Sequence, residues 1–218
     1  IVGALDIESV RSTVGYLAAP FLSQWVLPNT IIGISGSRSL YRLIEHMQPP
    51  SGTRGAVAVQ LMGNIGASVS YFDAIENCRN LAGSFGGVYY TLNAPAIAID
   101  ADSCQTFMAH HDVREVWDLY SAMQIAFVGI GSLAHSSFIE REVIAPDDVE
   151  RLRACGAIGE MCGRFYDNLG QECFPDFQER VVAIRLDELR RVREDVAVTA
   201  GVGRAEAILA AMRGRLIK

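Results

Sequence analysis

The chain of 218 residues carries 19 basic and 25 acidic side chains, a net charge of −6, and half of its residues are apolar. This composition excludes a disordered chain, and the negative charge argues against a nucleic-acid-binding surface within these residues, since phosphate contacts need a basic footprint. No apolar run approaches the ~20 residues of a membrane-spanning helix, and no signal-peptide pattern opens the chain. We therefore expect a cytoplasmic protein with no membrane partner.

Every basic residue except Lys218 is an arginine, which excludes an internal Schiff-base lysine and a P-loop lysine. Anion recognition must then use arginine or backbone N–H groups. The five cysteines form no CxxC pair and the four histidines form no HxxxH or HExxH pair. We expect reduced, mostly buried thiols, no metal site and no cofactor.

The chain opens with a helical pattern over residues 7–26, whose apolar stripe is predicted to contain Val10, Val14, Leu17, Ala18, Phe21, Leu22 and Trp25. Further on, strands alternate with helices. Strands are predicted at 30–34, 56–62, 88–92, 125–131, 181–186 and 196–200, and helices at 40–47, 71–84, 103–109, 112–121, 147–155, 187–192 and 204–214. This alternation predicts an α/β fold with a mainly parallel sheet.

Ligands of parallel sheets bind beyond the carboxyl ends of the strands, which directs attention to the loops 35–39, 63–70, 129–141 and 201–204. In the first loop, glycine allows close backbone approach, serine hydroxyls can donate, and the next helix presents its N-terminus. We expect an anion cradle there, with Arg38 as a bidentate donor. The alternative is a plain turn whose serines cap the helix.

Two other motifs carry a charge that suits a ligand. Arg204 follows a Gly-Val-Gly turn and begins a helix, where a cation is unfavourable unless it binds an anion. The alternative for Arg204 is a solvated pair with Glu206. Glu160 belongs to the glycine-flanked segment 159–167 and is expected to accept bonds from sugar hydroxyls, or else to be a surface carboxylate paired with an arginine. Arg164 in the same segment is expected to be structural.

The sequence Gly129-Ile130-Gly131-Ser132-Leu133-Ala134 is similar to a dinucleotide-binding fingerprint, but the residues after it show no clean helical period. A tight turn that lines a ligand site is the favoured interpretation, and a nucleotide-binding oxidoreductase is a remote alternative.

Five segments in order resemble the sugar-binding (effector) domain of SorC/DeoR-type bacterial transcriptional regulators. They are GISGSRSLYRL (33–43), VQLMGNIG (59–66), IAFVGIGSL (125–133), GAIGEMCGRFYD (156–167) and VTAGVGRAEAILAAMRG (198–214). The resemblance implies a Rossmann-like α/β domain with helices on both faces of the sheet, related to ribose-phosphate isomerase and glucosamine-6-phosphate deaminase folds. It also implies a sugar, polyol or sugar phosphate as ligand and a homodimer or homotetramer.

Residues 1–218 are expected to form this effector domain, while the helix-turn-helix through which such regulators bind operator DNA is expected to be absent from the chain. The ligand-binding residues predicted from the loops and the resemblance are Ser35, Gly36, Ser37, Arg38, Gln60, Asn64, Gly131, Arg141, Glu160 and Arg204. The family usually has a lysine at the position of Arg204, a small residue at that of Arg38 and asparagine at that of Asp73.

The alternative function is a sugar-phosphate isomerase or deaminase on the related fold. Such chemistry needs a positioned carboxylate, histidine or lysine near the sugar carbons. Glu160 alone is a thin catalytic set, so we predict no catalytic residues and a ligand-sensing domain rather than an enzyme.

Overall fold

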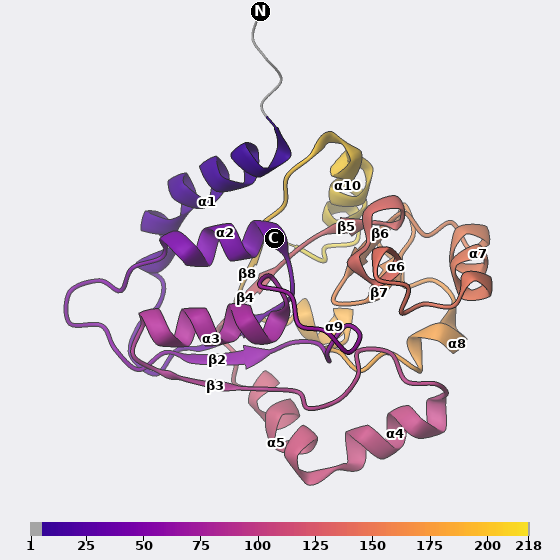
Figure 1. The fold of residues 1–218 in the computed structure, drawn as a ribbon, viewed down its shortest axis with the longest axis horizontal. Coiled ribbons are helices and arrows are strands. Elements are labelled where there is room, and N and C mark those ends of the chain that lie inside the picture. The colour runs from indigo at the N-terminus through magenta and orange to yellow at the C-terminus, as the bar shows by residue number, and fades with distance from the viewer. Residues whose placement is uncertain (1–5, 218) are drawn as a thin grey trace, which may run out of the picture.

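The computed structural model describes residues 6–217, which form one α/β unit around a five-stranded parallel sheet (Figure 1). The strand order is β3-β2-β1-β4-β8. The strands are β1 (Ile31–Ile34), β2 (Val57–Gln60), β3 (Val88–Tyr90), β4 (Ile125–Val128) and β8 (Glu194–Ala197). The predicted α/β class with a mainly parallel sheet is therefore confirmed.

Each face of the sheet has its own apolar core, because side chains alternate along a strand. On β4, Ile125 and Phe127 belong to one core, and Ala126 and Val128 to the other. The first core is covered by α1 (Ile7–Ser23), α2 (Arg38–His46) and α3 (Ala74–Ser84), which lie together in Figure 1. The second includes residues of α5 (His111–Tyr120) and α10 (Ala205–Arg213), so helices cover both faces.

The remaining helices are short. They are α4 (Ala101–Ala109), α6 (Ser137–Glu140), α7 (Pro146–Ala154), α8 (Pro175–Gln178) and α9 (Leu186–Leu189), with 3-10 turns at Leu133–His135 and Val202–Arg204. Among residues 6–217, no helix is both long and apolar enough to cross a membrane.

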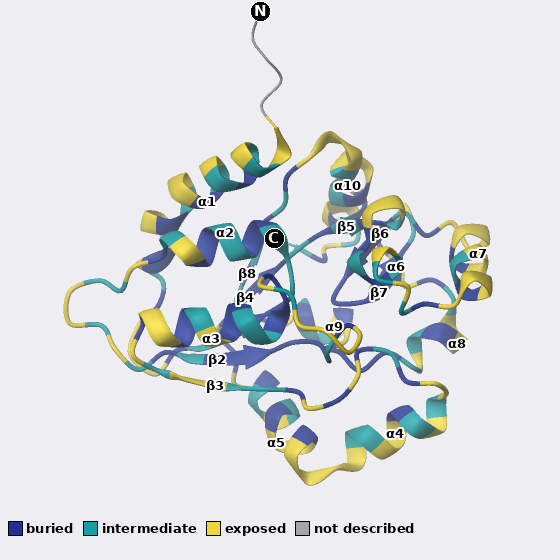
Figure 2. Cartoon of the chain, viewed as in Figure 1, coloured by how far each residue is buried: buried dark blue, intermediate teal, exposed yellow. Residues whose placement is uncertain are grey.

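Helix α1 buries only part of the apolar stripe that its sequence predicts: Leu22 is in the core and Val14 packs against it, but Leu17 and Phe21 do not. Its buried residues are Arg11, Gly15, Ala19, Leu22 and Ser23, whereas Leu17 and Phe21 are 69% and 62% exposed. The burial map shows the resulting outer, exposed side of the helix (Figure 2). The reason is close helix packing: a Cβ on Gly15 would lie 2.4 Å from the carbonyl oxygen of Arg42 in α2. The face of α1 that carries Gly15 and Ala19 therefore packs on α2, and the face that carries Leu17 and Phe21 stays exposed.

A second sheet, which is antiparallel, was not predicted. It joins β5 (Gly131–Ser132), β6 (Gly159–Met161) and β7 (Arg164–Tyr166) in that order. The segment 159–167, expected to be a turn, is thus a hairpin around Cys162 and Gly163, both with positive φ. Two such residues match the twist of a two-residue hairpin, although cysteine seldom occupies the first position.

The strand predicted at 181–186 is wrong, although Val181–Ile184 are buried. This segment makes only isolated bridges, Ile97 with Val181 and Met62 with Ala183. The buried guanidinium of Arg164 donates to the carbonyl oxygens of Ala183 and Ile184 at 2.9 and 2.7 Å. A structural role for Arg164 is thereby confirmed, and the apolar run reflects burial without a strand ladder.

The packing of α1 on α2 gives the first testable prediction. Gly15→Ala should lower the free energy of unfolding by about 1–3 kcal/mol, because the new methyl group meets the backbone of α2. Urea unfolding measures the change. Gly83→Ala, in the exposed last turn of α3 where nothing lies within 4 Å of the added atom, is the matched control and should raise stability by up to about 1 kcal/mol. Equal responses at both positions would contradict the close approach.

Candidate functional site

A pocket lies beyond the carboxyl ends of β1, β4 and β8, where the sheet topology places a ligand site. Loops from distant parts of the chain meet there. The lining residues are Arg11, Gly36, Ser37, Arg38, Ser39, Gly129, Ile130, Gly131, His135, Ser137, Glu160, Cys162, Thr199 and Arg204.

The buried Ser35 holds the floor of this pocket together. Its N–H donates to the carbonyl oxygen of Phe127 at 3.1 Å, and its Oγ accepts from the N–H of Gly129 at 3.0 Å. The amide of Asn77 donates to its carbonyl oxygen at 3.2 Å. Ser35 thus joins the ends of β1 and β4 to helix α3.

Helix α2 presents its N-terminus to the pocket. Ser37 is its N-cap, and the Ser37 Oγ accepts from the N–H groups of Ser39 and Leu40 at 3.2 and 3.4 Å. The capping role considered for these serines is therefore present, and Ser37 also lines the pocket. A capped helix N-terminus attracts negative charge through its dipole.

Three arginines line the pocket from three different elements. Arg11 comes from α1, Arg38 from the first turn of α2, and Arg204 from the end of the 3-10 turn before α10. The Arg204 Nη1 donates to the carbonyl oxygen of Ala200 at 2.8 Å. Burial lowers the pKa of Arg204, and the nearby positive charges of Arg11 and Arg38 lower it further. The site therefore concentrates positive charge in partly desolvated surroundings.

Glu160 supplies an acidic group to the same pocket from β6. Its side chain accepts a hydrogen bond from the N–H of Gly163 in the hairpin turn at 2.6 Å. Burial raises the pKa of Glu160 to about 7, against the opposing effects of the Gly163 N–H, the Arg204 charge and the Ser136 hydroxyl. Glu160 can thus donate or accept a hydrogen bond near neutral pH.

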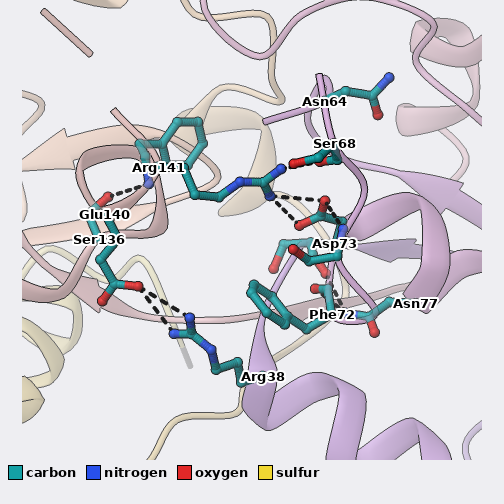
Figure 3. Close-up of polar contacts among 12 residues, drawn as sticks. Arg38, Asn64, Ser68, Phe72, Asp73, Asn77, Ser136, Glu140 and Arg141 are labelled. Atoms are coloured by element: carbon teal, nitrogen blue, oxygen red, sulfur yellow. Dashed lines mark hydrogen bonds and ion pairs between the residues drawn. The ribbon is translucent and has the colours of Figure 1, made fainter. Parts of the chain in front are cut away.

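Two ion pairs join the segment at α6 to the N-terminal ends of α2 and α3 (Figure 3). Arg38 pairs with Glu140 at 3.3 Å, and its guanidinium carbon lies 4.5 Å from the ring centroid of Phe72. The neighbouring Arg141 contacts both carboxylate oxygens of Asp73 at 2.8 and 3.0 Å. The guanidinium of Arg38 is therefore paired with a carboxylate of the chain itself.

A family model described as "Putative sugar-binding domain" matches residues 1–218. The chain belongs to this Sugar-bind family. Its SorC/DeoR-type character is confirmed by the matching proteins, which are transcriptional regulators.

Among curated relatives of this Sugar-bind chain, "Uncharacterized transcriptional regulator YjhU" of Escherichia coli K12 is 24% identical over 210 residues, which cover 96% of the chain and 63% of that protein. The sorbitol operon regulator of Klebsiella pneumoniae is 24% identical over 217 residues, or 99% and 69% of the two chains. The chain thus spans about two thirds of the length of these relatives.

The crystal structure of the full-length sorbitol operon regulator SorC from Klebsiella pneumoniae superposes with a TM-score of 0.90 at 24% identity. The match covers all of this chain and 70% of that one. The structure described as "Probable sor Operon Regulator from Shigella flexneri" gives a TM-score of 0.88 at 22% identity, over 99% and 85% of the two chains. These likenesses show a shared fold.

The structure gathers part of the predicted binding set of this Sugar-bind domain in one pocket. Gly36, Ser37, Arg38, Gly131, Glu160 and Arg204 line it together. Their role as ligand contacts remains a prediction.

The other predicted residues lie outside that lining. Ser35 is beneath the floor, and Arg141 pairs with Asp73. Gln60 is buried, and its Nε2 donates to the carbonyl oxygen of Met62 at 2.7 Å and to the Oδ1 of Asn64 at 3.1 Å. These hydrogen bonds occupy Gln60 with the loop after β2.

The predicted binding set did not include eight of the lining residues, which are Arg11, Ser39, Gly129, Ile130, His135, Ser137, Cys162 and Thr199. For Arg11 a signal existed, because it lies at four-residue spacing from the small residues Gly15 and Ala19 on the same face of the helix. A charged side chain on a buried stripe calls for a polar partner.

The dinucleotide alternative for residues 129–134 does not fit the structure. The glycines lead into the two-residue strand β5 and a 3-10 turn, and only the four-residue helix α6 follows. A dinucleotide fold instead places the pyrophosphate on the N-terminus of a full helix. Within the described chain, no group of three or more His, Cys, Asp or Glu residues is arranged to hold a metal ion.

The raised pKa of Glu160 gives a prediction for stability. Because burial raises the pKa of Glu160 in the folded state to about 7, from the ordinary 4.5 of a glutamate, the native state holds the extra proton between these pH values, and stability falls as pH rises through this window. Glu160→Gln removes the ionisation. Between pH 5 and pH 8, the free energy of unfolding of the variant should therefore rise by about 1–3 kcal/mol relative to that of the wild type.

Urea unfolding across this pH range measures the difference. Glu206→Gln, which changes an exposed carboxyl on α10, is the control and should leave the pH dependence unchanged. Parallel pH profiles for the wild type and Glu160→Gln would contradict the buried ionisation.

Proposed function

We propose that this chain is the ligand-sensing domain of a bacterial transcriptional regulator and that its pocket binds a sugar or sugar phosphate that alters operator binding by the full-length protein. The observation that carries the proposal is the meeting of Ser37, Arg38, Arg204 and Glu160 in one pocket at the strand ends. Names of matching proteins support it, since they include a sorbitol operon regulator and a deoxyribonucleoside regulator.

The chemistry of the pocket suggests how such a ligand lies. An anionic group is placed between the 35–39 loop and Arg204, where a helix N-terminus and guanidinium groups converge. Glu160 is placed at the hydroxyl end of the sugar, because a carboxylate beside a phosphate would be repelled when ionised. A carboxyl with a pKa of about 7 can exchange donor and acceptor roles with sugar hydroxyls.

We propose sensing rather than catalysis. One observation favours a catalytic function: His135 and Glu160 line the same pocket and could act as acid–base groups. Turnover of pentose or hexose phosphates by the purified chain would establish the isomerase or deaminase alternative. The transcriptional regulators among its relatives favour sensing.

We further propose that residues 1–218 are the effector domain alone, that operator DNA is bound by a helix-turn-helix N-terminal to them, and that the regulator works in the cytoplasm. The chain matches about two thirds of its relatives' length, which leaves room for such a domain. Its net charge of −6 suits an effector domain better than a DNA-binding surface.

Two substitutions distinguish the ends of the ligand. Arg204→Ala should weaken a sugar phosphate by roughly 2–3 kcal/mol, the scale of a charge-assisted hydrogen bond, and a free sugar or polyol much less. Glu160→Ala should weaken both kinds, because hydroxyl contacts are common to them. Calorimetric titration measures these affinities once a thermal-shift screen of sugars, polyols and sugar phosphates has found a ligand. Unchanged phosphate affinity in Arg204→Ala would contradict the placement.

We also propose a homodimer or homotetramer, since twofold symmetry suits paired operator half-sites. Tyr16, Leu17 and Phe21 form an exposed apolar strip on α1 that such a contact can bury. Leu22 of the same helix is buried in the core and is not available to such a contact.

Light scattering should therefore give at least twice the 23.7 kDa of one chain at tens of micromolar. Leu17→Glu should shift the mass towards the monomer, whereas Ile99→Glu, which changes an exposed residue outside α1, should not. A monomeric wild-type chain would count against self-association of this domain.

A further inference from the structure

Arg11 is the charged residue of this pocket that neither the sequence motifs nor the proposed function uses. It lies on the buried face of α1 and is only 8% exposed, yet it lines the pocket together with Arg38 and Arg204. The other pocket residues belong to loops, helix ends and the short strands β5 and β6. Arg11 is the pocket's link to helix α1.

Two of the three guanidinium groups have carboxylate partners within the chain. Arg11 pairs with Glu8 one turn earlier in α1, and Arg38 pairs with Glu140. For Arg204, no carboxylate of the described chain lies within 4.0 Å, and its guanidinium donates to the carbonyl oxygen of Ala200. The positive charge of the pocket is therefore neutralised only in part by carboxylates of the chain.

Arg11 can exchange Glu8 for another anion without leaving the carboxylate of Glu8 unpaired. Glu8 also lies 3.7 Å from the Nε of Arg42 on α2, so it keeps a cationic neighbour when Arg11 turns to another anion. The positive charge of Arg11 already acts on Arg204, as the lowered pKa of Arg204 reflects. An anion between these two guanidinium groups would remove that repulsion.

We propose that Arg11 is a ligand of the anionic group bound in the pocket, and that through Arg11 the anion fastens helix α1 to the N-terminal end of α2 and to the turn before α10. This inference rests on the proposed function. Without an anion, the ion pair of Arg11 lies within α1; with one, it bridges α1 to two other elements. Ligand binding is thereby linked to how firmly α1 is docked.

Under this proposal, substitutions of Glu8 and Arg11 should change phosphate affinity in opposite directions. Arg11→Gln removes a ligand of the anion, so it should weaken binding of inorganic phosphate, the simplest probe of the site, on the order of tenfold. Glu8→Gln removes the competing carboxylate and leaves Arg11 free, so it should tighten phosphate binding severalfold. If the ion pair had only a structural role, both variants would bind phosphate more weakly than the wild type or equally well.

Matched controls come from α3, where Glu76 and Arg79 form an ion pair at the same three-residue spacing outside the pocket. Arg79→Gln and Glu76→Gln make the same changes in net charge, and each should leave phosphate affinity within about twofold. Calorimetric titration at fixed ionic strength compares the five proteins, and titration with sorbitol shows whether the effects are confined to an anion. Arg11→Lys should restore part of the lost affinity.

Amide hydrogen exchange reports on α1 directly. Saturating phosphate should slow exchange of the α1 amides in the wild type and should not do so in Arg11→Gln brought to the same occupancy. If Arg11→Gln does not fold, Glu8→Gln still decides, since unchanged or weaker phosphate binding in that variant overturns the proposal.

Failure of this inference and failure of the proposed function look different. If Arg204→Ala loses phosphate affinity while Arg11→Gln retains it, Arg11 is not a ligand and the proposed anion site stands. If wild-type chain binds neither phosphate nor any sugar phosphate, the anion site and the role of Arg11 both fall. Equal slowing of α1 exchange in wild type and Arg11→Gln overturns the link to α1.

Discussion

The hydrogen bonds of Ser35 fix the geometry on which the rest of the site depends. A single buried serine uses its N–H, hydroxyl and carbonyl groups to hold the end of β1 against β4 and α3. This leaves Gly36 and Ser37 free to turn into α2 at a defined position. Ser35, which sets the spacing, is thus a different residue from Gly36, Ser37 and Arg38, which follow it in the same loop and line the pocket.

Position in a parallel sheet explains why much of the site was predictable. A βα loop must lie at the carboxyl edge, so Gly36, Arg38 and Arg204 meet there whatever their distance in sequence. Gln60 also follows this rule, yet its amide is occupied by Met62 and Asn64. Which strand-end side chain turns inward depends on local hydrogen bonds that a sequence pattern does not contain.

The predictions that failed have separate physical causes. On α1, the close approach at Gly15 outweighed burial of Leu17 and Phe21. In 181–186, burial without a neighbouring strand gave an apolar run with no ladder. The hairpin at Cys162 carried a visible glycine, but cysteine at positive φ is too uncommon to be anticipated.

The order of the central strands has a consequence for how the protein is made. Ile32 pairs with Ile125, and Ile125 pairs with Glu194, so the middle of the sheet joins segments that leave the ribosome far apart in time. Such non-local pairing slows folding. The pocket takes Arg11 from near the start of the chain and Arg204 from near its end. The pocket of a nascent chain is therefore incomplete until residue 204 has left the ribosome, and the proposed ligand response needs nearly the whole α/β unit.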